Sequence, residues 1–571
     1  MKDIIRREVE RALADCGVAT DGFDIETPKR REFGDFSTNA AMTAAKKTGG
    51  NPRELAARLA DMLQKNGDLF EKVEVAGPGF VNFFMKPSAV VSRLPEIQER
   101  GERFGSSPKR GENVLLEFVS ANPTGPLHFG HARGAVVGDV LGNILEFAGY
   151  GVEREFYIND AGRQMELLGE SVRASMTGGE IPADGYRGDY IKDIMASEEI
   201  DIIADEISRE IYDDIIREFM ERFENLTYEE AIKQIREEKT AERCGERAYK
   251  KLLGAIRDDL RLIGVEFDNW VSEKDTIHTE NDRGQTAIKN AMKDLEEAGA
   301  VKDEDGARWF LATKYGDSQD WVLRKKDRAP TYFMADIAYH LNKFERSNGG
   351  RLINIWGADH HSHVGRLAAA MRALGLDDEK LKTLLIQFVR LVRDGKEEAM
   401  GKRAGSYVTL REVAELVGAD ATRFFLLIRA AESHLDFDLE LAKKTSNENP
   451  VYYVQYAHAR TASIKRKASQ QGMSASAEHL ELLELASEVE IVKILLAFPD
   501  VVSDSARDFA PHKIAFYLQG LASAFHSYYN ANRVITEDKK LSSARLFLCE
   551  CVATALRNGL GLAGVGAPER M

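Results

Sequence analysis

Short apolar runs that alternate with longer helical patterns occupy the middle of the chain. The runs at residues 114–118, 152–158, 351–356 and 384–391 have the length and composition of buried strands, and the stretches between them carry apolar residues at helical spacing. Strands that alternate with helices in this way are typical of a parallel sheet covered by helices. The middle of the chain is therefore predicted to be an α/β domain with a Rossmann-type parallel sheet.

The pattern changes on both sides of this region and once inside it. Residues 1–108 combine predicted helices and strands and end in a stretch with Gly, Ser and Pro, which indicates a separate N-terminal α+β domain. The α/β domain spans 109–445, and a charged amphipathic stretch interrupts it as an insertion at about 178–265. Residues 446–571 are almost purely helical in pattern, which predicts a C-terminal helical bundle. The expected fold class is multidomain, α/β plus all-α.

Composition narrows the class of protein further. The chain has 571 residues, 43% of them hydrophobic, and a formal net charge of −15, which argues against indiscriminate binding of nucleic acid. The sequence has no apolar run of the ~18 residues that a membrane span needs. The charged, amphipathic first residues do not resemble a secretory signal, so we expect a cytoplasmic protein. Four cysteines without a Cys-x-x-Cys pair argue against structural zinc and against a disulfide framework.

Two histidines lie where the first of the central strands is followed by a helix. His128 and His131 stand three residues apart with Gly130 between them, after a predicted strand at 113–118. Free N–H groups and the dipole at a helix N-terminus favour anions, and two imidazoles add donors for phosphate oxygens. Gly130 allows a flat ring to approach the backbone. This arrangement predicts a nucleotide triphosphate site, the alternative being two histidines that cap or pack at a helix start.

The sequence around these histidines resembles the His-Ile-Gly-His signature of class I aminoacyl-tRNA synthetases. The longer segment Glu-Phe-Val-Ser-Ala-Asn-Pro-Thr-Gly-Pro-Leu-His-Phe-Gly-His at 117–131 is similar to the arginyl family in particular. Further segments that resemble the same family are distributed over nearly the whole chain, at 33–39, 77–84, 157–162, 356–360, 418–425, 436–438, 449–460 and 567–571.

The resemblance implies an arginine–tRNA ligase. Such an enzyme activates arginine with ATP, releases pyrophosphate, and transfers the arginyl group to the 3′-terminal adenosine of tRNA(Arg), with Mg²⁺ arriving on the nucleotide. It also implies that residues 1–108 contact the tRNA elbow and that the helical domain binds the anticodon. The expected partners are tRNA(Arg), L-arginine and ATP, and we expect a monomer without a membrane or DNA partner.

The resemblance assigns the ATP site to three segments. His128, His131 and Lys402 are the expected catalytic residues, and Gly130, Gly357, Asp359, His360 and Met400 are expected to bind ATP. Lys402 and Met400 belong to a lysine loop at 396–405, in which Ala399 and Gly401 replace the first lysine and the serine that family members often carry. Lys402 can still place a point charge on the phosphates. The histidines at 360–363 lack a further ligand group, so we assign no metal site there.

The arginine site is expected to contain carboxylates, because a guanidinium presents a planar fork of N–H donors. By resemblance, Glu117, Asn122, Tyr332 and Asp336 bind the arginine substrate. Tyr332 and Asp336 lie four residues apart after Pro330, so they share one face of a predicted helix. In the helical domain, aromatic and basic residues suit stacking on unpaired bases, and the expected tRNA-binding residues are Tyr452, Tyr453, Tyr456 and Arg460.

Three other readings stay open at this point. A sibling synthetase would need a different pocket in place of Glu117 and Asp336, and another nucleotidyltransferase of the superfamily would lack the helical anticodon domain. A non-catalytic, tRNA-binding paralogue is the third, and the altered loop around Lys402 gives it some weight.

Overall fold

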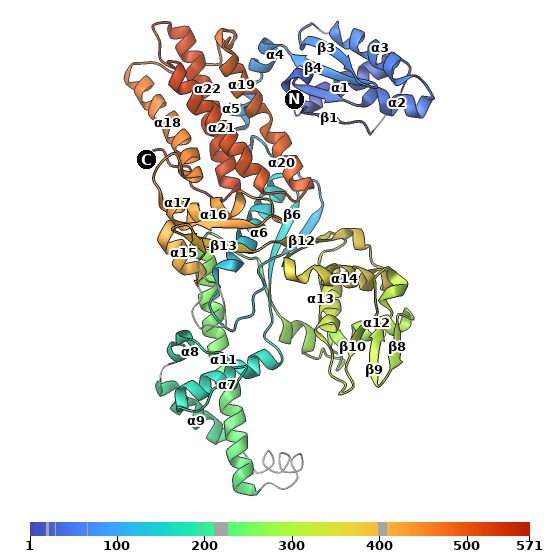
Figure 1. Cartoon of the computed structure of the whole chain (residues 1–571), viewed down its shortest axis with the longest axis vertical. Coiled ribbons are helices and arrows are strands. Elements are labelled where there is room, and N and C mark those ends of the chain that lie inside the picture. Colours follow the sequence, from blue (N-terminus) through green and yellow to red (C-terminus); the bar gives the residue numbers. More distant parts are fainter. Residues whose placement is uncertain (19–21, 29, 66, 196, 211–226, 398–407) are drawn as a thin grey trace. The chain divides into compact units, whose positions relative to one another are not determined.

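The structure, a computed structural model, describes all residues except 19–21, 29, 66, 196, 211–226 and 398–407 (Figure 1). Its contacts separate the chain into two units. One consists of 1–107, 450–508 and 513–571, and the other of 108–449 and 509–512. The N-terminal α+β segment and the C-terminal helices, which the sequence divides into separate domains, therefore share one unit. No helix in the described ranges is long and apolar enough to cross a membrane.

A five-stranded sheet forms the centre of the 108–449 unit. All of its neighbouring strands are parallel, and their order is β12-β11-β5-β6-β7. The sheet confirms the predicted parallel α/β class, and β11 returns beside β5 after a long excursion of the chain. The strands are β5 (Asn113–Glu117), β6 (Gly151–Ile158), β7 (Asn269–Ser272), β11 (Arg351–Gly357) and β12 (Leu381–Ile386).

The helix α6 (Phe129–Phe147) packs closely on β5. An added Cβ at Gly138 would lie 2.3 Å from Cγ of Phe118, so glycine is needed for this approach. Arg133 is fully buried, and its guanidinium donates to the backbone oxygens of Gln387, Ser433 and Ala430 at 2.7–2.9 Å. These bonds attach the first turns of α6 to two loops of the same unit and hold the start of the helix in place.

Helices and two smaller sheets surround the central sheet. The antiparallel sheet β10-β9-β8 lies beside α12 and α13, and the second sheet has the order β14-β13-β15. The elements are α12 (Ala287–Glu297), β8 (Val301–Glu304), β9 (Ala307–Phe310), β10 (Trp321–Arg324), α13 (Tyr332–Arg346), α14 (His361–Ala373), β13 (Val389–Arg393), β14 (Lys396–Glu397), α15 (Leu410–Val417), α16 (Ala419–Leu427), β15 (Leu435–Asp438) and α17 (Leu439–Lys443).

The apolar pattern at 384–391 predicted a single strand, but this run contains parts of two strands. The chain leaves the parallel sheet at Ile386 and enters the second sheet at Val389. Between them, the Gln387 amide donates to the Ala431 backbone oxygen at 2.9 Å, and Phe388 is exposed. The two strands belong to different sheets, and they form one continuous apolar run in the sequence because Phe388, between them, is apolar although it is exposed.

The described residues between β6 and β7 are mostly helical. In Figure 1, α7 and α9 lie beside the long helix α11, and the helices share a core that includes Leu168, Ile203 and Cys244. A capping box formed by Thr227 and Glu230 starts α11. The helices are α7 (Arg163–Thr177), α8 (Asp189–Asp193), α9 (Ser197–Glu210) and α11 (Tyr228–Leu262), and the first of them begins upstream of residue 178.

The other unit contains an antiparallel sheet, β1-β2-β4-β3, and a helical bundle. The helix α5 packs on α22, where Gln98 donates to Thr554 at 3.1 Å and Asn558 donates to the backbone oxygen of Gly101 at 2.9 Å. The elements are α1 (Lys2–Asp15), β1 (Ile25–Glu26), β2 (Phe36–Thr38), α2 (Ala40–Thr48), α3 (Pro52–Gln64), β3 (Phe70–Ala76), β4 (Phe80–Met85), α4 (Pro87–Val91), α5 (Leu94–Arg100), α18 (Pro450–Gln470), α19 (Ala486–Leu496), α20 (Phe498–Arg507), α21 (His512–Ala531) and α22 (Lys539–Leu562).

Candidate active site

The turn after β5 has a strained backbone. Val119 and Ser120 have φ values of 68° and 41°, a conformation that a β-branched residue rarely adopts. The Ser120 hydroxyl holds this turn, because it donates to Oε1 of Glu117 at 2.8 Å and accepts from the Tyr157 amide at 3.1 Å. Such strain costs about 1–3 kcal/mol and is concentrated at functional sites. The turn redirects the chain at the carboxyl edge of a parallel sheet, where such sheets bind ligands.

The turn leads to the paired histidines. His128 is the N-cap residue of α6, and its ring stacks on that of His131 with 3.7 Å between centroids. A Cβ at Gly130 would lie 2.8 Å from Nδ1 of His128, so the glycine makes room for this stacked pair. The His128 side chain makes no capping hydrogen bond to the helix. The structure therefore brings the two rings together as a pair at the helix N-terminus.

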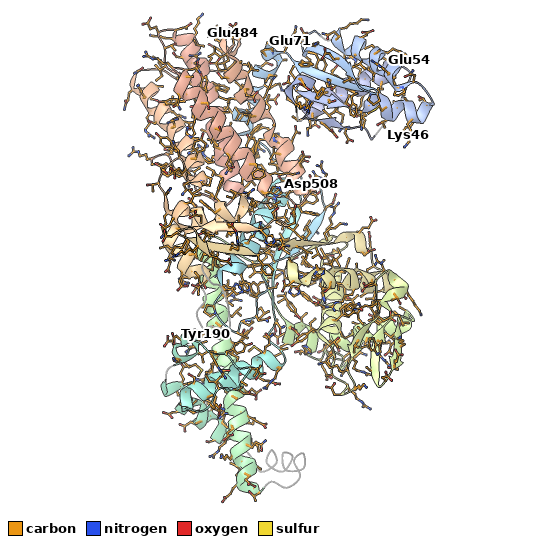
Figure 2. All side chains as sticks on the ribbon, viewed as in Figure 1. Lys46, Glu54, Glu71, Tyr190, Glu484 and Asp508 are labelled. Atoms are coloured by element: carbon orange, nitrogen blue, oxygen red, sulfur yellow. The ribbon has the colours of Figure 1, made fainter. Side chains whose placement is uncertain are left out.

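Backbone pairing connects residues 408–410, which follow the lysine loop in the sequence, to this helix start. The Phe129 amide donates to the Val408 oxygen at 3.0 Å, and the Leu410 amide donates to the Leu127 oxygen at 2.9 Å. The insertion also reaches this region, because the Tyr190 hydroxyl (labelled in Figure 2) donates to the Thr124 backbone oxygen at 2.9 Å. Met400 and Lys402 themselves lie outside the described residues.

Two of the expected arginine-binding residues lie on the first turns of α13. Tyr332 begins the helix and is 69% exposed, and the Asp336 side chain retains 29% exposure. Burial alone would raise the pKa of Asp336, but the hydrogen bond from His363 and nearby positive charge outweigh it and lower the pKa. Asp336 is therefore a carboxylate that carries its charge and remains accessible. Asn122 is exposed in the turn after β5.

Glu117 lies below this surface in a buried ionic network. It is 5% exposed, and Lys343, which has no exposed surface, donates to its Oε2 at 2.6 Å. The same ammonium donates to Oδ1 of Asn354 at 2.6 Å. On the next strand, Glu155 is fully buried and accepts from Arg346 and Tyr339. The network compensates the charge of Glu117, although each of its oxygens retains a second lone pair.

Strand register and helix periodicity together build this network. Glu117 is paired with Glu155 on β6 and with Asn354 on β11, so three polar side chains lie in one row across the sheet. The helix α13 covers the row with Tyr339, His340, Lys343 and Arg346. Sequence reasoning did not identify these four residues of α13. The acidic residues inside the apolar strand runs, Glu117 and Glu155, could have indicated them, because a buried acid requires a partner.

The expected adenosine residues lie at the end of β11. Gly357 is its last residue, and Asp359 and His360 follow in a short helical turn. A Cβ at Gly357 would lie 2.5 Å from Oδ1 of Asp359, so the carboxylate folds back over the glycine. Both side chains of the turn are mostly exposed, and their closest approach is 3.8 Å. The turn thus presents polar groups at the same edge of the sheet as the histidines.

The expected tRNA-binding residues form an aromatic and basic cluster on α18, in the other unit. None of the four is fully buried. The Arg460 guanidinium lies over the rings of Tyr456 and Tyr529 at 4.7 and 4.5 Å, and it contacts Nδ1 of His526 at 2.7 Å. Tyr452 stacks with Tyr456, and Tyr453 packs on His526. Sequence reasoning missed His526 and Tyr529, because both come from α21.

Comparison with known proteins identifies the family. The description "Arginyl tRNA synthetase N terminal domain" matches residues 2–85, "tRNA synthetases class I (R), catalytic domain" matches 93–433, and "DALR anticodon binding domain" matches 454–571. The chain belongs to the class I arginyl-tRNA synthetases.

Individual relatives of this synthetase match over their full length or nearly so. An arginine–tRNA ligase of Syntrophotalea carbinolica is 42% identical, with 100% of both chains covered. One of Carboxydothermus hydrogenoformans is 44% identical, with 96% of this chain and 94% of the relative covered. The solved arginyl-tRNA synthetase of Thermus thermophilus has the same fold, with a TM-score of 0.75, 23% identity and complete coverage of both chains.

Proposed function

We infer that this synthetase ligates arginine to tRNA(Arg) at the carboxyl edge of the parallel sheet. In the first step, an oxygen of the arginine carboxylate attacks the α-phosphorus of ATP, and the bond to the bridging oxygen breaks to release pyrophosphate. In the second step, the 2′-hydroxyl of the tRNA terminal adenosine attacks the carbonyl carbon of arginyl-adenylate, and AMP leaves. The stacked pair His128–His131 at the N-terminus of α6 is the observation that carries this proposal.

The histidine pair supplies hydrogen-bond donors where negative charge develops. The reaction needs no covalent enzyme intermediate, so positioning and charge stabilisation provide the rate enhancement. The free N–H groups of the first turn of α6 add to the imidazoles. Val408, six positions after Lys402 in the sequence, is paired with Phe129 at the start of α6. In this proposal Lys402 contacts the phosphates, and Met400 lies beside the nucleotide.

The adenosine part of ATP binds at the neighbouring strand end. Gly130 and Gly357 are the points where the backbone comes near the ligand, and Asp359 and His360 supply polar side chains. Mg²⁺ enters on the ATP phosphates, and the described residues contain no group of three or more His, Cys, Asp or Glu side chains that could hold a metal ion by themselves. The metal neutralises phosphate charge, and the protein residues orient the nucleotide.

Arginine binds above the buried network. Asp336 accepts from the guanidinium, and Tyr332, at the exposed start of the same helix, covers it. Asn122 contacts the amino acid from the turn after β5, and Glu117 supplies deeper acceptor oxygens. A charge-assisted, two-oxygen contact with a guanidinium is a strong and specific interaction.

The other unit binds the tRNA. Tyr452, Tyr453, Tyr456 and Arg460 stack on unpaired anticodon bases, and residues 1–108 contact the elbow. The catalytic domain is 109–445 and the anticodon domain 446–571. The protein acts as a cytoplasmic monomer.

ATP–pyrophosphate exchange with each amino acid, with and without total tRNA, tests the proposal. We expect exchange with arginine, and only when tRNA is present. Exchange with another amino acid would refute the pocket assignment, and tRNA binding without any exchange would favour the non-catalytic paralogue.

The variant Asp336→Asn then tests the arginine site. Its amide keeps the shape of the carboxylate but removes the charge that a guanidinium needs. We expect the KM for arginine to rise roughly tenfold to a hundredfold, as for a lost hydrogen bond to a charged group. An unchanged KM for arginine would place the guanidinium elsewhere.

A further inference from the structure

Asp336 does not lie alone on α13 but is held by a residue of α14. The Nε2 atom of His363 contacts Oδ2 of Asp336, and the described residues offer no hydrogen bond to the other oxygen, Oδ1. His363 is itself 8% exposed. The contact fixes the plane of the carboxylate at the residue proposed above to meet the substrate guanidinium.

The contact at Nδ1 decides which ring nitrogen of His363 carries the proton. The Nε atom of Arg366 donates to Nδ1 of His363 at 2.6 Å, and a terminal nitrogen of the same guanidinium also contacts Nδ1. Arginine can donate but cannot accept, so Nδ1 must carry a lone pair. The ring proton therefore resides on Nε2, which donates to Asp336. This hydrogen bond holds the carboxylate in place.

Arg366 is in turn oriented by aromatic rings. Its guanidinium lies over the rings of Trp321 and Phe333, at 4.6 and 5.0 Å from their centroids. The Trp321 indole donates to Oδ2 of Asp317 at 2.7 Å. These contacts connect the small antiparallel sheet to the edge of the site.

We propose that His363 and Arg366 are positioning residues for arginine recognition. Arg366, clamped on Trp321 and Phe333, fixes the tautomer of His363, and the Nε2–H of His363 keeps Asp336 charged and aimed at the substrate. The proposal rests on the assignment of Asp336 to the arginine guanidinium. Neither residue touches the reacting phosphate or carboxylate in this scheme, so their effect is on the KM for arginine and not on kcat.

Two substitutions at residue 363 separate this role from packing. His363 also packs edge-on against Phe333 and beside Trp356. His363→Phe keeps an aromatic ring but removes both hydrogen bonds, and we expect the KM for arginine to rise roughly tenfold to a hundredfold, with kcat changed by less than about threefold. His363→Gln retains one donor and one acceptor, and we expect it to restore the KM to within about threefold.

Arg366→Met tests the second step of the relay. Methionine keeps a long apolar side chain against the two rings but donates nothing to His363, and we expect the KM for arginine to rise roughly threefold to tenfold. The KM and kcat come from tRNA-dependent exchange, and calorimetric titration of the full chain with arginine gives the Kd. Tryptophan fluorescence confirms that each variant is folded.

The outcomes distinguish the relay from the site on which it depends. If Asp336→Asn raises the KM but His363→Phe and Arg366→Met both leave it within twofold, the relay is refuted and the arginine site stands. If Asp336→Asn itself has no effect, the site assignment fails. If His363→Phe does not fold, His363→Gln and Arg366→Met still decide: a Gln variant as impaired as Asp336→Asn, or a Met variant equal to the native protein, refutes the relay.

Discussion

The substitution Lys343→Met measures how strongly the buried network of Glu117, Lys343 and Asn354, under the proposed arginine site, depends on its cation. Lys343 has no exposed surface, and its ammonium donates to Glu117 and Asn354 at 2.6 Å each. Methionine fills a similar volume but donates nothing, so Glu117 loses its cationic partner where solvent reaches 5% of the residue. Removing one partner of a buried ion pair typically costs about 3–5 kcal/mol. We expect the unit to lose that much of its free energy of unfolding.

Tryptophan fluorescence isolates the relevant transition. The sequence has 4 tryptophans, at 270, 309, 321 and 356, and all of them lie in the 108–449 unit. Urea unfolding followed by tryptophan emission therefore reports on the unit that contains Lys343, and the shift of its midpoint gives the change in stability.

The double variant Lys343→Met with Glu117→Gln supplies the control. It removes both charges, and the glutamine oxygen can still accept from Ser120, so we expect it to be more stable than Lys343→Met alone. A loss below about 1 kcal/mol for Lys343→Met, or losses that simply add in the double variant, would refute the view that the pair is a coupled, desolvated unit.

Three further predictions concern packing, pH and the loop. Gly138→Ala should lower the free energy of unfolding of the same unit by about 1–3 kcal/mol, because its Cβ would meet the Phe118 ring at 2.3 Å. Gly134→Ala is the control: its Cβ would meet nothing within 4 Å, so this variant should be neutral or stabilising. Equal urea midpoints for the two variants would contradict this packing. Burial lowers the pKa of His340 to about 3, so the unfolded chain takes up a proton before the folded chain as the pH falls below about 6.5. The free energy of unfolding should therefore drop by about 1 kcal/mol per pH unit toward pH 4. In His340→Gln, the free energy of unfolding measured with urea should depend on pH less steeply, by the equivalent of one proton. Lys402→Ala should bind arginine normally but lose orders of magnitude in exchange, and near-normal exchange would remove Lys402 from the mechanism.

Local pattern was sufficient for the region around the histidines. The strand expected at 113–118 and the helix expected from about residue 128 are β5, which ends at Glu117, and α6, which begins at Phe129. An apolar run, a turn rich in Gly and Pro and a 3.6-residue period are all encoded within a few residues of each element. The same holds for Tyr332 and Asp336, whose shared helix follows from their spacing.

Register between distant strands was the part that local pattern could not supply. Glu117, Glu155 and Asn354 become neighbours only because β6 and β11 pair with β5 on either side. Lys343 then reaches this row from α13, and His363 reaches Asp336 from α14, two helices that follow separate strands. The union of residues 1–107 with the C-terminal helices is another long-range result, since it depends on contacts such as Gln98 with Thr554. Such contacts leave no periodicity in the sequence.

Charge balance explains why the proposed site for the arginine guanidinium, a cation, lies over the buried cations Lys343 and Arg346. An arginine pocket needs negative charge, but unpaired acids in the interior would be too costly to keep ionised. Lys343 neutralises Glu117 and Arg346 neutralises Glu155, so the two deep pairs cancel. Asp336 instead accepts a hydrogen bond from His363, and no lysine or arginine of the described residues forms an ion pair with it. In the proposed site, the substrate guanidinium would supply this missing ion pair, which would favour arginine over a neutral amino acid of the same shape.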